Sequence, residues 1–316
     1  MASDRLSIIF GTVLVGKEEP FIAEDYLQTI WSTLQSHGVT TLDTAQLYCN
    51  AEQRLGEVKA GDIFTIDTKW LAGWVPGSGT KDTIVKSVKA SVHKLGVDIF
   101  YLHSPDAQTN LEETLEGVNE AYNSGLYKRF GLSNFSASEA ERVYNVCKAN
   151  NWILPTVYQG NYSPVARLQE TLLFPTLREL DMAFYAYSPL AGGLLTKTAK
   201  QIEEGVGRFG KDVAGGMYRD MYNKPSYLNA LTKWERIAQE EGVSRAELAY
   251  RWVSSNSQLS TQKYGDAIVI GASSLEQLRD TLDGLAKGPL SEMACAGINE
   301  VWEDVKHDAP LDNFNR

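Results

Sequence analysis

Eight short apolar runs alternate with longer amphipathic segments, and this alternation restricts the fold more than any other feature of the sequence. Runs such as IFYL (99–102) and AIVI (267–270) lack the polar positions of a half-exposed strand, so they indicate strands buried on both faces. Strands that alternate with helices pair in parallel through crossover connections. The sequence therefore predicts an α/β fold, a (β/α)8 TIM barrel, that takes up residues 1–316 as a single domain.

The eight predicted strands cover residues 8–12, 41–44, 63–69, 99–103, 129–133, 156–159, 183–187 and 267–271. Three of the intervening segments begin with capping-box pairs, namely Ser136 with Glu139, Ser244 with Glu247 and Ser274 with Gln277. Gly38, Gly96 and Gly125 stand where helices are expected to end. These start and stop signals support a helix after most of the strands.

A doubly wound sheet is the rival fold, and it would carry a Gly-rich dinucleotide turn directly after its first strand. The first predicted strand leads instead into GTVLVGK (11–17). One G-x-G-x-x-G string occurs at 205–210, but it follows the polar stretch KTAKQIEE and opens no apolar helix. We interpret that string as part of a loop.

Two long segments interrupt the regular alternation. Residues 191–226 exceed by far the two to six residues, roughly, of an ordinary βα loop, and such long loops are usually functional or disordered. Residues 289–305 are predicted to form an extra helix, followed by the tail KHDAPLDNFNR (306–316). We expect this tail to close over the mouth of the barrel.

Four polar residues stand near the C-terminal ends of predicted strands, where the loops of such barrels gather around one mouth. They are Asp43, Tyr48, Lys69 and His103. A tyrosine with a pKa of about 10 gives up its proton reluctantly, and a neighbouring ammonium is expected to lower that pKa. Asp43 would hold Lys69 in place, Tyr48 would donate a proton to a carbonyl oxygen, and a neutral His103 would orient that oxygen.

Composition excludes several classes of protein. The formal net charge of −10 and the absence of a basic stripe argue against nucleic-acid binding. No apolar run approaches a membrane span, and the first residues lack a secretory signal, so we expect a cytoplasmic protein. The three cysteines, Cys49, Cys147 and Cys295, are too widely spaced to suggest a disulfide framework or a metal site.

Several strings in the chain are similar to those of a known family: LDTAQLY, DTK, FYLHSPD, GLSNF, NNWILPTVYQGNY, FYAYSPLAGGLLT, GRFG and GASSLEQL. Over nearly its whole length the chain resembles the aldo-keto reductase superfamily, and most closely the aflatoxin-aldehyde reductase group. The resemblance implies NADPH-dependent reduction of an aldehyde or ketone, with the cofactor extended across the barrel mouth without a Rossmann motif. It also implies a homodimer, with a small carbonyl compound as the substrate.

The same resemblance assigns roles to individual residues. It implies Tyr48 as general acid, Lys69 and Asp43 as its supporting pair, with Asp43 also near the cofactor, and His103 as the residue that orients the substrate. The cofactor residues that it implies are Ser133, Asn134 and Gln159 at the carboxamide, Tyr187 against the nicotinamide ring, Ser188, Leu190, Gly192, Gly193, Leu194 and Thr196 along the pyrophosphate, and Arg208, Gly271, Ser273, Gln277 and Arg279 around the adenosine phosphate.

Recognition of the substrate is the least determined part. The resemblance implies His103, Trp70, Tyr218 and Arg316 as substrate residues, with Trp74, Leu47, Tyr162 and Phe314 as further apolar lining. Relatives that reduce carboxylated aldehydes carry a Y-R-x-R string, whereas this chain has Tyr218-Arg-Asp-Met221. Met221 cannot form an ion pair with a carboxylate, so the sequence does not decide between carboxylated and bulky aromatic carbonyl substrates.

The sequence is compatible with three functions. The first is the carbonyl reductase, the second a nucleotide-binding barrel with a regulatory role, and the third an isomerase or aldolase that uses Lys69 as a Schiff base. Taken singly, Tyr48, Lys69 or His103 would be interpreted as an ordinary buried polar residue. Cys49 lies next to Tyr48, but a thiol without a cationic neighbour in sequence is usually inert.

Overall fold

Eight parallel strands close into a barrel in which every strand pairs with its neighbours in sequence and β1 pairs with β8. The computed structural model describes residues 5–315, without the side chains of residues 92–94. The strands are β1 Ser7–Gly11, β2 Thr41–Asp43, β3 Thr65–Trp70, β4 Val97–Leu102, β5 Arg129–Ser133, β6 Pro155–Asn161, β7 Ala183–Tyr187 and β8 Ala267–Ile270. The predicted barrel is confirmed, with strand ends that differ by at most two residues from the prediction.

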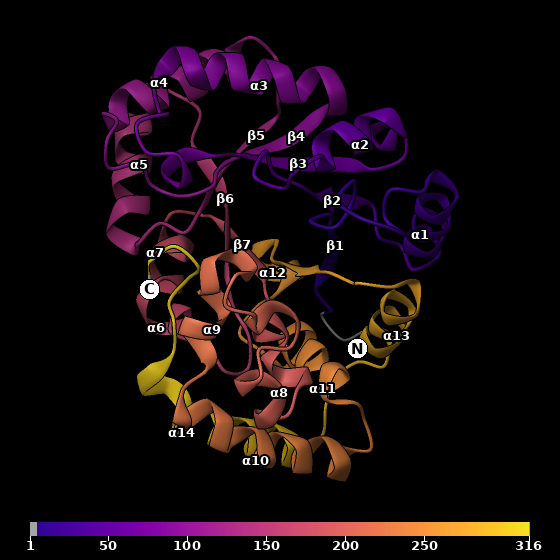
Figure 1. The fold of residues 1–316 in the computed structure, drawn as a ribbon. Helices are drawn as coiled ribbons and strands as arrows, with labels where there is room; N and C mark the ends of the chain where they lie inside the picture. The colour runs from indigo at the N-terminus through magenta and orange to yellow at the C-terminus, as the bar shows by residue number, and fades with distance from the viewer. Residues whose placement is uncertain (1–4, 316) are drawn as a thin grey trace.

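Helices surround the barrel on its outside, as Figure 1 shows, with α3 beside α4 on one flank and α10 beside α14 on the other. The helices are α1 Glu24–Ser36, α2 Ala51–Glu57, α3 Lys81–Leu95, α4 Leu111–Asn123, α5 Ala137–Ala149, α6 Gln169–Leu172, α7 Phe174–Glu179, α8 Ala199–Glu203, α9 Met217–Tyr222, α10 Pro225–Glu241, α11 Arg245–Arg251, α12 Thr261–Tyr264, α13 Leu275–Ala286 and α14 Glu292–Val305. Among residues 5–315, no helix is both long and apolar enough to cross a membrane.

The helix boundaries follow the signals in the sequence. Ser136 and Glu139 form the complete capping box at α5. Ser274 accepts the backbone N–H of Gln277, but the Gln277 side chain bonds Ser273 instead, so the reciprocal bond is missing there. Gly38, Gly96 and Gly125 follow α1, α3 and α4 with φ values of 74°, 64° and 71°, a left-handed backbone that glycine adopts without steric cost.

Two cores result from the alternation of side chains along the strands. Outward-facing residues such as Leu42, Ile66 and Leu102 pack against the helices. Inward-facing residues fill the barrel, and they include Ile9, Val157 and Val269. The inner core also holds the hydroxyl groups of Tyr101 and Tyr185, so the barrel interior is less apolar than the runs in the sequence suggest.

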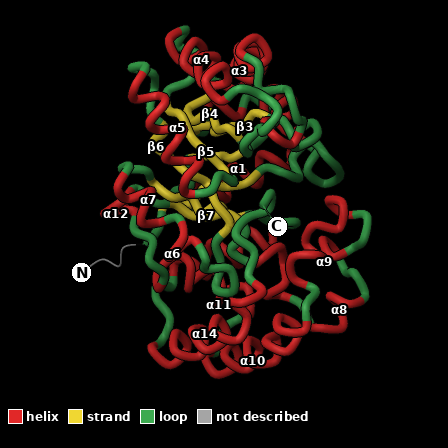
Figure 2. The backbone as a smooth tube through the Cα atoms, turned by 90° about the vertical axis from the view of Figure 1, so that its left-hand side faces the viewer, coloured by secondary structure: helices red, strands yellow, loops and turns green. Residues whose placement is uncertain are grey.

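The long segment after β7 is folded, and the prediction of a loop there needs correction. It contains the short turns η3 Ala191–Thr196, η4 Gly207–Phe209 and η5 Val213–Gly216, together with α8 and α9. The G-x-G-x-x-G string surrounds η4 and opens no long helix, as predicted. The predicted extra helix is α14, and the chain then returns to the barrel, where its described end lies close to β7 in Figure 2.

Candidate active site

The four residues of the predicted constellation lie together at the C-terminal ends of β2, β3 and β4. Backbone bonds continue the sheet pattern beyond the end of β2, because the N–H of Thr44 donates to Asp67 and that of Gln46 to Lys69. This extension turns the chain so that Tyr48 lies above β3. His103 follows β4 directly, and its N–H donates to the carbonyl of Trp70 at 3.2 Å.

Lys69 and Asp43 form a buried ion pair. The Lys69 ammonium donates to Oδ1 and Oδ2 of Asp43 at 2.6 Å each and to the carbonyl of Thr44 at 2.9 Å. The side chain of Gln159 on β6 donates to Asp43 Oδ1 at 2.8 Å. With Lys69 0% and Asp43 2% exposed, solvent does not screen this pair, and attraction to Asp43 raises the pKa of Lys69 against the effect of burial.

Tyr48 lies beside this pair, with Lys69 Nζ 5.3 Å from the centre of its ring. The Lys69 charge lowers the pKa of Tyr48, as expected from the sequence. Burial raises that pKa by more, with Asp43 adding to the increase, so the pKa of Tyr48 lies above its ordinary value. The sequence-based expectation of a lowered pKa for Tyr48 is therefore wrong. The sequence could not show how closely the surrounding residues enclose the phenol.

His103 faces Tyr48 edge to face, with ring centres 6.1 Å apart. It is 8% exposed, and burial first, then the charge of Lys69, hold its pKa well below the usual value. The imidazole is neutral at physiological pH, as predicted. A neutral ring can donate one hydrogen bond without adding a positive charge that would compete with Lys69.

A second group of polar side chains surrounds the tetrad. Asn134, with φ at 61°, donates to the carbonyl of His103 at 2.8 Å and accepts from the Tyr187 hydroxyl at 2.7 Å. Ser133 lies next to it, 1% exposed and 3.2 Å from the Asn134 amide. Together with Gln159, these side chains offer the donors and acceptors that a carboxamide requires.

The connection after β7 has a run of left-handed backbone at Ser188, Ala191, Gly192 and Gly193, with φ of 55°, 51°, 67° and 98°. Leu190, Leu194 and Thr196 lie in the same turn. A Cβ at Gly192 would come within 2.2 Å of the Tyr218 ring, so Tyr218 packs on this glycine. Within this turn the N–H groups of Ala191 and Gly193 donate to the carbonyls of Ser188 and Leu190 at 2.8 and 2.9 Å, so the backbone closes the turn on itself.

Two cations accompany that turn. Arg208 lies over the Tyr218 ring at 5.5 Å, and Lys197 Nζ lies near Gly193 and Gly207. Burial and the neighbouring Arg208 charge lower the pKa of Lys197, which shows two like charges held near each other. The sequence reasoning missed Lys197, although it directly follows Thr196 in the string GGLLTK.

The predicted adenosine segment begins at Gly271, after β8. Ser273, Gln277 and Arg279 are all exposed, and the Ser273 hydroxyl donates to the Gln277 side chain at 2.8 Å. The Tyr250 hydroxyl donates to the Gly271 carbonyl at 3.4 Å, and burial raises its pKa to about 12 while Arg208 opposes that rise. Arg208 therefore lies between the turn after β7 and the start of α13.

The predicted substrate residues divide into two sets. Trp74 and Phe314 pack edge to face with ring centres 5.1 Å apart, and Trp74 lies 6.0 Å from the His103 ring. Trp70 is instead packed outside the barrel, because it is next to the inward-facing Lys69 and therefore faces the opposite side of β3. Tyr162 is fully buried and donates to Glu170, so neither residue reaches the mouth.

The remaining predicted substrate contacts are Tyr218 and Arg316, and Arg219 is the cation that follows Tyr218 in the sequence. Tyr218 lies beside Gly192, and Arg208 lies over its ring at 5.5 Å. Arg219 donates to the carbonyl of Glu203, so it is bound to α8. Arg316 lies outside the described residues.

The C-terminal tail completes the mouth through contacts that the sequence did not specify. The N–H of Asn313 donates to the Tyr187 hydroxyl at 3.2 Å, and the Asn315 amide donates to the Asn134 carbonyl at 3.1 Å. Asp312, 2% exposed, accepts from the N–H groups of Phe314 and Asn315. The predicted closure by the tail is confirmed for its described residues.

Comparison with known proteins shows the family. The model of the aldo/keto reductase family matches residues 7–303. The chain belongs to the aldo/keto reductase family. It is 39% identical to the oxidoreductase sirO of Leptosphaeria maculans across 97% of each chain, and 35% identical to the aflatoxin B1 aldehyde reductase member 2 of Rattus norvegicus across 97% of this chain and 87% of that protein. It is also 37% identical to aldo-keto reductase family 7 member A3 of Homo sapiens, with 86% and 87% covered.

This aldo/keto reductase is an oxidoreductase of the carbonyl-reducing type, and its residues fit a nicotinamide dinucleotide. Amide and hydroxyl groups line the end near Lys69, and the cations Lys197 and Arg208 lie close to each other beside the left-handed turn after β7. Among residues 5–315, no group of three or more His, Cys, Asp or Glu side chains is placed to hold a metal ion. Tyr48, the Lys69–Asp43 pair and the neutral His103 lie in barrel strands or in the segments that directly follow them.

Proposed function

We propose that this aldo/keto reductase uses NADPH to reduce an aldehyde or ketone to an alcohol, with Tyr48 as the proton donor. The observation that carries the proposal is the position of Tyr48 between the buried Lys69–Asp43 pair and the neutral His103. Bound NADPH would supply the hydride. The chain supplies the proton and the groups that hold the carbonyl in place.

In this mechanism the Tyr48 hydroxyl donates its proton to the carbonyl oxygen as negative charge develops there. Lys69, 5.3 Å from the phenol ring, stabilises the phenolate that results. Asp43 keeps Lys69 protonated and fixes the ammonium in position. His103 donates a hydrogen bond to the same carbonyl oxygen, which its neutral state allows.

The proposed cofactor residues are those that the family resemblance implies, and the arrangement of their side chains supports the assignment. Ser133, Asn134 and Gln159 would bind the nicotinamide carboxamide, with Tyr187 against the ring. The turn Ser188–Thr196 and Lys197 would bind the pyrophosphate. Arg208 and the segment from Gly271 to Arg279 would bind the adenosine phosphate, which favours NADPH over NADH because the 2′-phosphate needs a cation.

The pair Trp74 and Phe314 beside His103 supports an aldehyde with an aromatic or bulky apolar group, which would stack on these rings. Curated relatives are named as aldehyde reductases, which agrees with this substrate class. We propose a homodimer located in the cytoplasm as well. Both of those statements rest on the sequence and the resemblance.

The test compares wild type with Tyr48→Phe across a panel of aldehydes. We expect the variant to lose roughly a hundredfold to ten-thousandfold in reduction rate, because general acid catalysis contributes about that much. NADPH binding, followed by fluorescence, should stay the same in both. A variant that keeps the wild-type rate would show that Tyr48 is not the acid.

The same assay has a pH signature. Because the pKa of Tyr48 is raised above 10.0, the donor stays protonated through the neutral range and wild-type reduction should decline only at strongly alkaline pH. Alcohol oxidation needs the phenolate as a base, so it should increase with pH over the same range. If the wild-type reduction rate instead declines near neutral pH, and this decline is absent in Tyr48→Phe, the raised pKa of Tyr48 would be contradicted.

A further inference from the structure

Asp67 lies inside the barrel directly below the catalytic pair, and the proposed mechanism does not use it. It stands on β3 two residues before Lys69, so both side chains face the barrel interior. Its backbone is also in register with Asp43 on the neighbouring strand β2. At 1% exposed, Asp67 has no access to bulk water that could solvate a charge.

The hydrogen bonds of Asp67 differ from those of other buried carboxylates in the barrel. Asp43 accepts bonds from Lys69 and Gln159, and Asp266 accepts two from Arg178 as well as the N–H of Phe184. Within the described structure, Asp67 accepts one bond, from the N–H of Ile99 at 3.2 Å. A buried carboxylate that is ionised is normally paired with a cation or with several donors.

Among the residues that the structure describes, each cation near Asp67 already has another partner. Lys69 is bound to Asp43, and the Arg129 guanidinium on β5 bonds Tyr185 at 3.5 Å and lies 4.0 Å from Asp98. Tyr101 on β4 faces the same interior, and its hydroxyl has no hydrogen-bond partner among the described residues. Burial, followed by repulsion from Asp43 and Asp98, raises the pKa of Asp67 well above its usual range.

We propose that Asp67 is a positioning residue held as a neutral carboxylic acid, and that its neutrality leaves Lys69 bound to Asp43 alone. The role in catalysis rests on the proposed function. An ionised Asp67 would draw the Lys69 ammonium away from Tyr48 and would add negative charge beneath the phenol. Both effects would make Tyr48 a weaker acid.

The protonation of Asp67 can be measured without any assay of activity. At pH 6 an aspartate in the unfolded chain is ionised, since its pKa is about 3.9. When wild type unfolds in weakly buffered denaturant, the carboxylic acid of Asp67 should therefore release its proton. Asp67→Asn lacks that acid, so it should release about one proton per chain fewer than wild type. The control is Asp106→Asn, because the N–H groups of Gly77, Gln108 and Gly79 and the Thr109 hydroxyl lower the pKa of Asp106 against the effect of burial, so this variant should release as many protons as wild type.

Equal proton release by wild type and Asp67→Asn would overturn the proposal, because it would show that Asp67 is already ionised in the folded protein. If Asp67→Asn does not fold, Asp67→Ser gives the same comparison, since its hydroxyl can still accept the Ile99 N–H. This measurement stands even if wild type reduces no carbonyl compound. Failure of the proposed function and failure of this inference are therefore separate results.

The positioning role has its own readout in the pH profile of reduction. Asp67→Asn replaces a neutral acid by an amide of the same shape, so the variant and wild type should differ mainly in how kcat changes with pH. As pH rises, wild type should lose rate earlier than Asp67→Asn, since only wild type acquires the extra charge. Identical profiles, or a loss of more than about tenfold at pH 7, would refute the role.

Discussion

Lys69 and Asp43 form an ion pair that serves both stability and chemistry. The ammonium has three short contacts, to the two oxygens of Asp43 and to the carbonyl of Thr44, and no exposed surface. A buried ion pair stabilises the fold little more than two apolar side chains in its place would. Removal of only one partner, however, leaves a buried charge without a counter-charge. The two roles can therefore be separated by substitution.

We expect Lys69→Met to lower the free energy of unfolding by about 3–5 kcal/mol, because Asp43 is left buried without its cation. The double variant Lys69→Met with Asp43→Asn should recover most of that stability and none of the reductase activity. Urea unfolding and aldehyde reduction measure the two effects. Equal stability of the single and double variants would show that the unpaired charge is not the cause.

The sequence predicted the identity of these residues better than their energetics. Asp43, Lys69 and His103 could be found because parallel strands bring their C-terminal ends to one mouth. The raised pKa of Tyr48 and the neighbours of Asp67 depend on enclosure by several strands, which no local pattern records. Trp70 was assigned to the mouth although the alternation along β3 places it opposite to Lys69.

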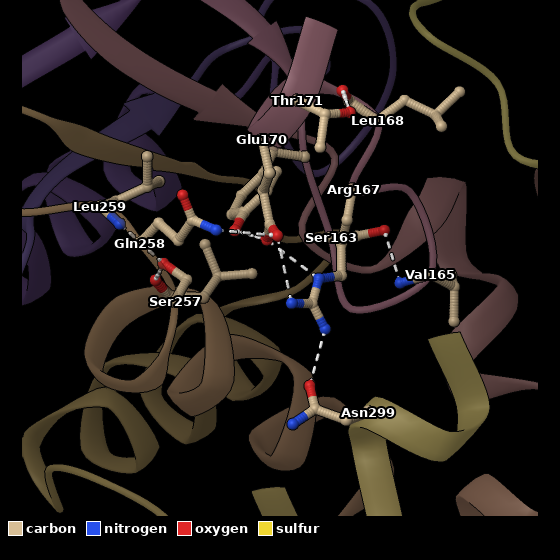
Figure 3. A network of polar contacts seen from close by, with 12 residues as sticks. Ser163, Val165, Arg167, Leu168, Glu170, Thr171, Ser257, Gln258, Leu259 and Asn299 are labelled. Carbon is tan, nitrogen blue, oxygen red and sulfur yellow. Dashed lines mark hydrogen bonds and ion pairs between the residues drawn. The ribbon is translucent and has the colours of Figure 1, made fainter. Parts of the chain in front are cut away.

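The connection between β6 and α6 is held by a network of polar side chains shown in Figure 3. Arg167 donates to both carboxylate oxygens of Glu170 and to Asn299 of α14. Glu170 also accepts from Tyr162 and Gln258, and the guanidinium lies 4.7 Å from the Trp252 ring. This network attaches α14, which precedes the tail, to the barrel and to the turn η6 Trp252–Asn256.

Arg167→Met should destabilise the protein by about 3 kcal/mol, because Glu170 is only 10% exposed and would lose its cation. Reduction rate per folded molecule should stay close to wild type, since the network lies away from the tetrad. The matched control is Arg236→Met, whose pair with Glu240 is exposed and contributes no more than about 0.5 kcal/mol. Similar losses in thermal unfolding of both variants would refute the assignment.

No motif in the sequence pointed to this network. The segment around Arg167 and the segment around Gln258 are far apart along the chain, and both lack the periodic pattern that identifies a helix or strand. The folded state of residues 191–226 was missed for a similar reason. Its short turns are stabilised by contacts such as Tyr218 on Gly192, which only the three-dimensional arrangement supplies.

In the complete molecule, the ends of the described chain meet the barrel at opposite faces. β1 pairs with β2 and β8 in the barrel wall, whereas the tail crosses the mouth and bonds Tyr187 and Asn134. Phe314 covers Trp74 there, at 5.1 Å between ring centres. The tail is thus a part of the mouth, and it is also bonded farther back, where Leu311 accepts from the side chain of Gln169.

Removal of residues 313–316 should raise KM for an aromatic aldehyde by about tenfold, which corresponds to the loss of one aromatic contact of roughly 1.4 kcal/mol. The midpoint of thermal unfolding should fall somewhat, because the buried Asp312 loses the N–H donors of Phe314 and Asn315, although the barrel core does not include the removed residues. Phe314→Leu, which keeps apolar volume but loses the ring, should show part of the same effect. An unchanged KM in both variants would exclude the tail from substrate binding.

The pairing of β1 with β8 also sets the order of events during synthesis. Ser7 is opposite Ala267, so one edge of β1 has no partner until about 260 further residues have been made. At roughly 5–20 residues per second, that interval lasts on the order of 10 to 50 s. During this time the apolar strand SIIFG presents an open edge to other chains. The newly made protein is therefore most exposed to aggregation before its last strand emerges from the ribosome.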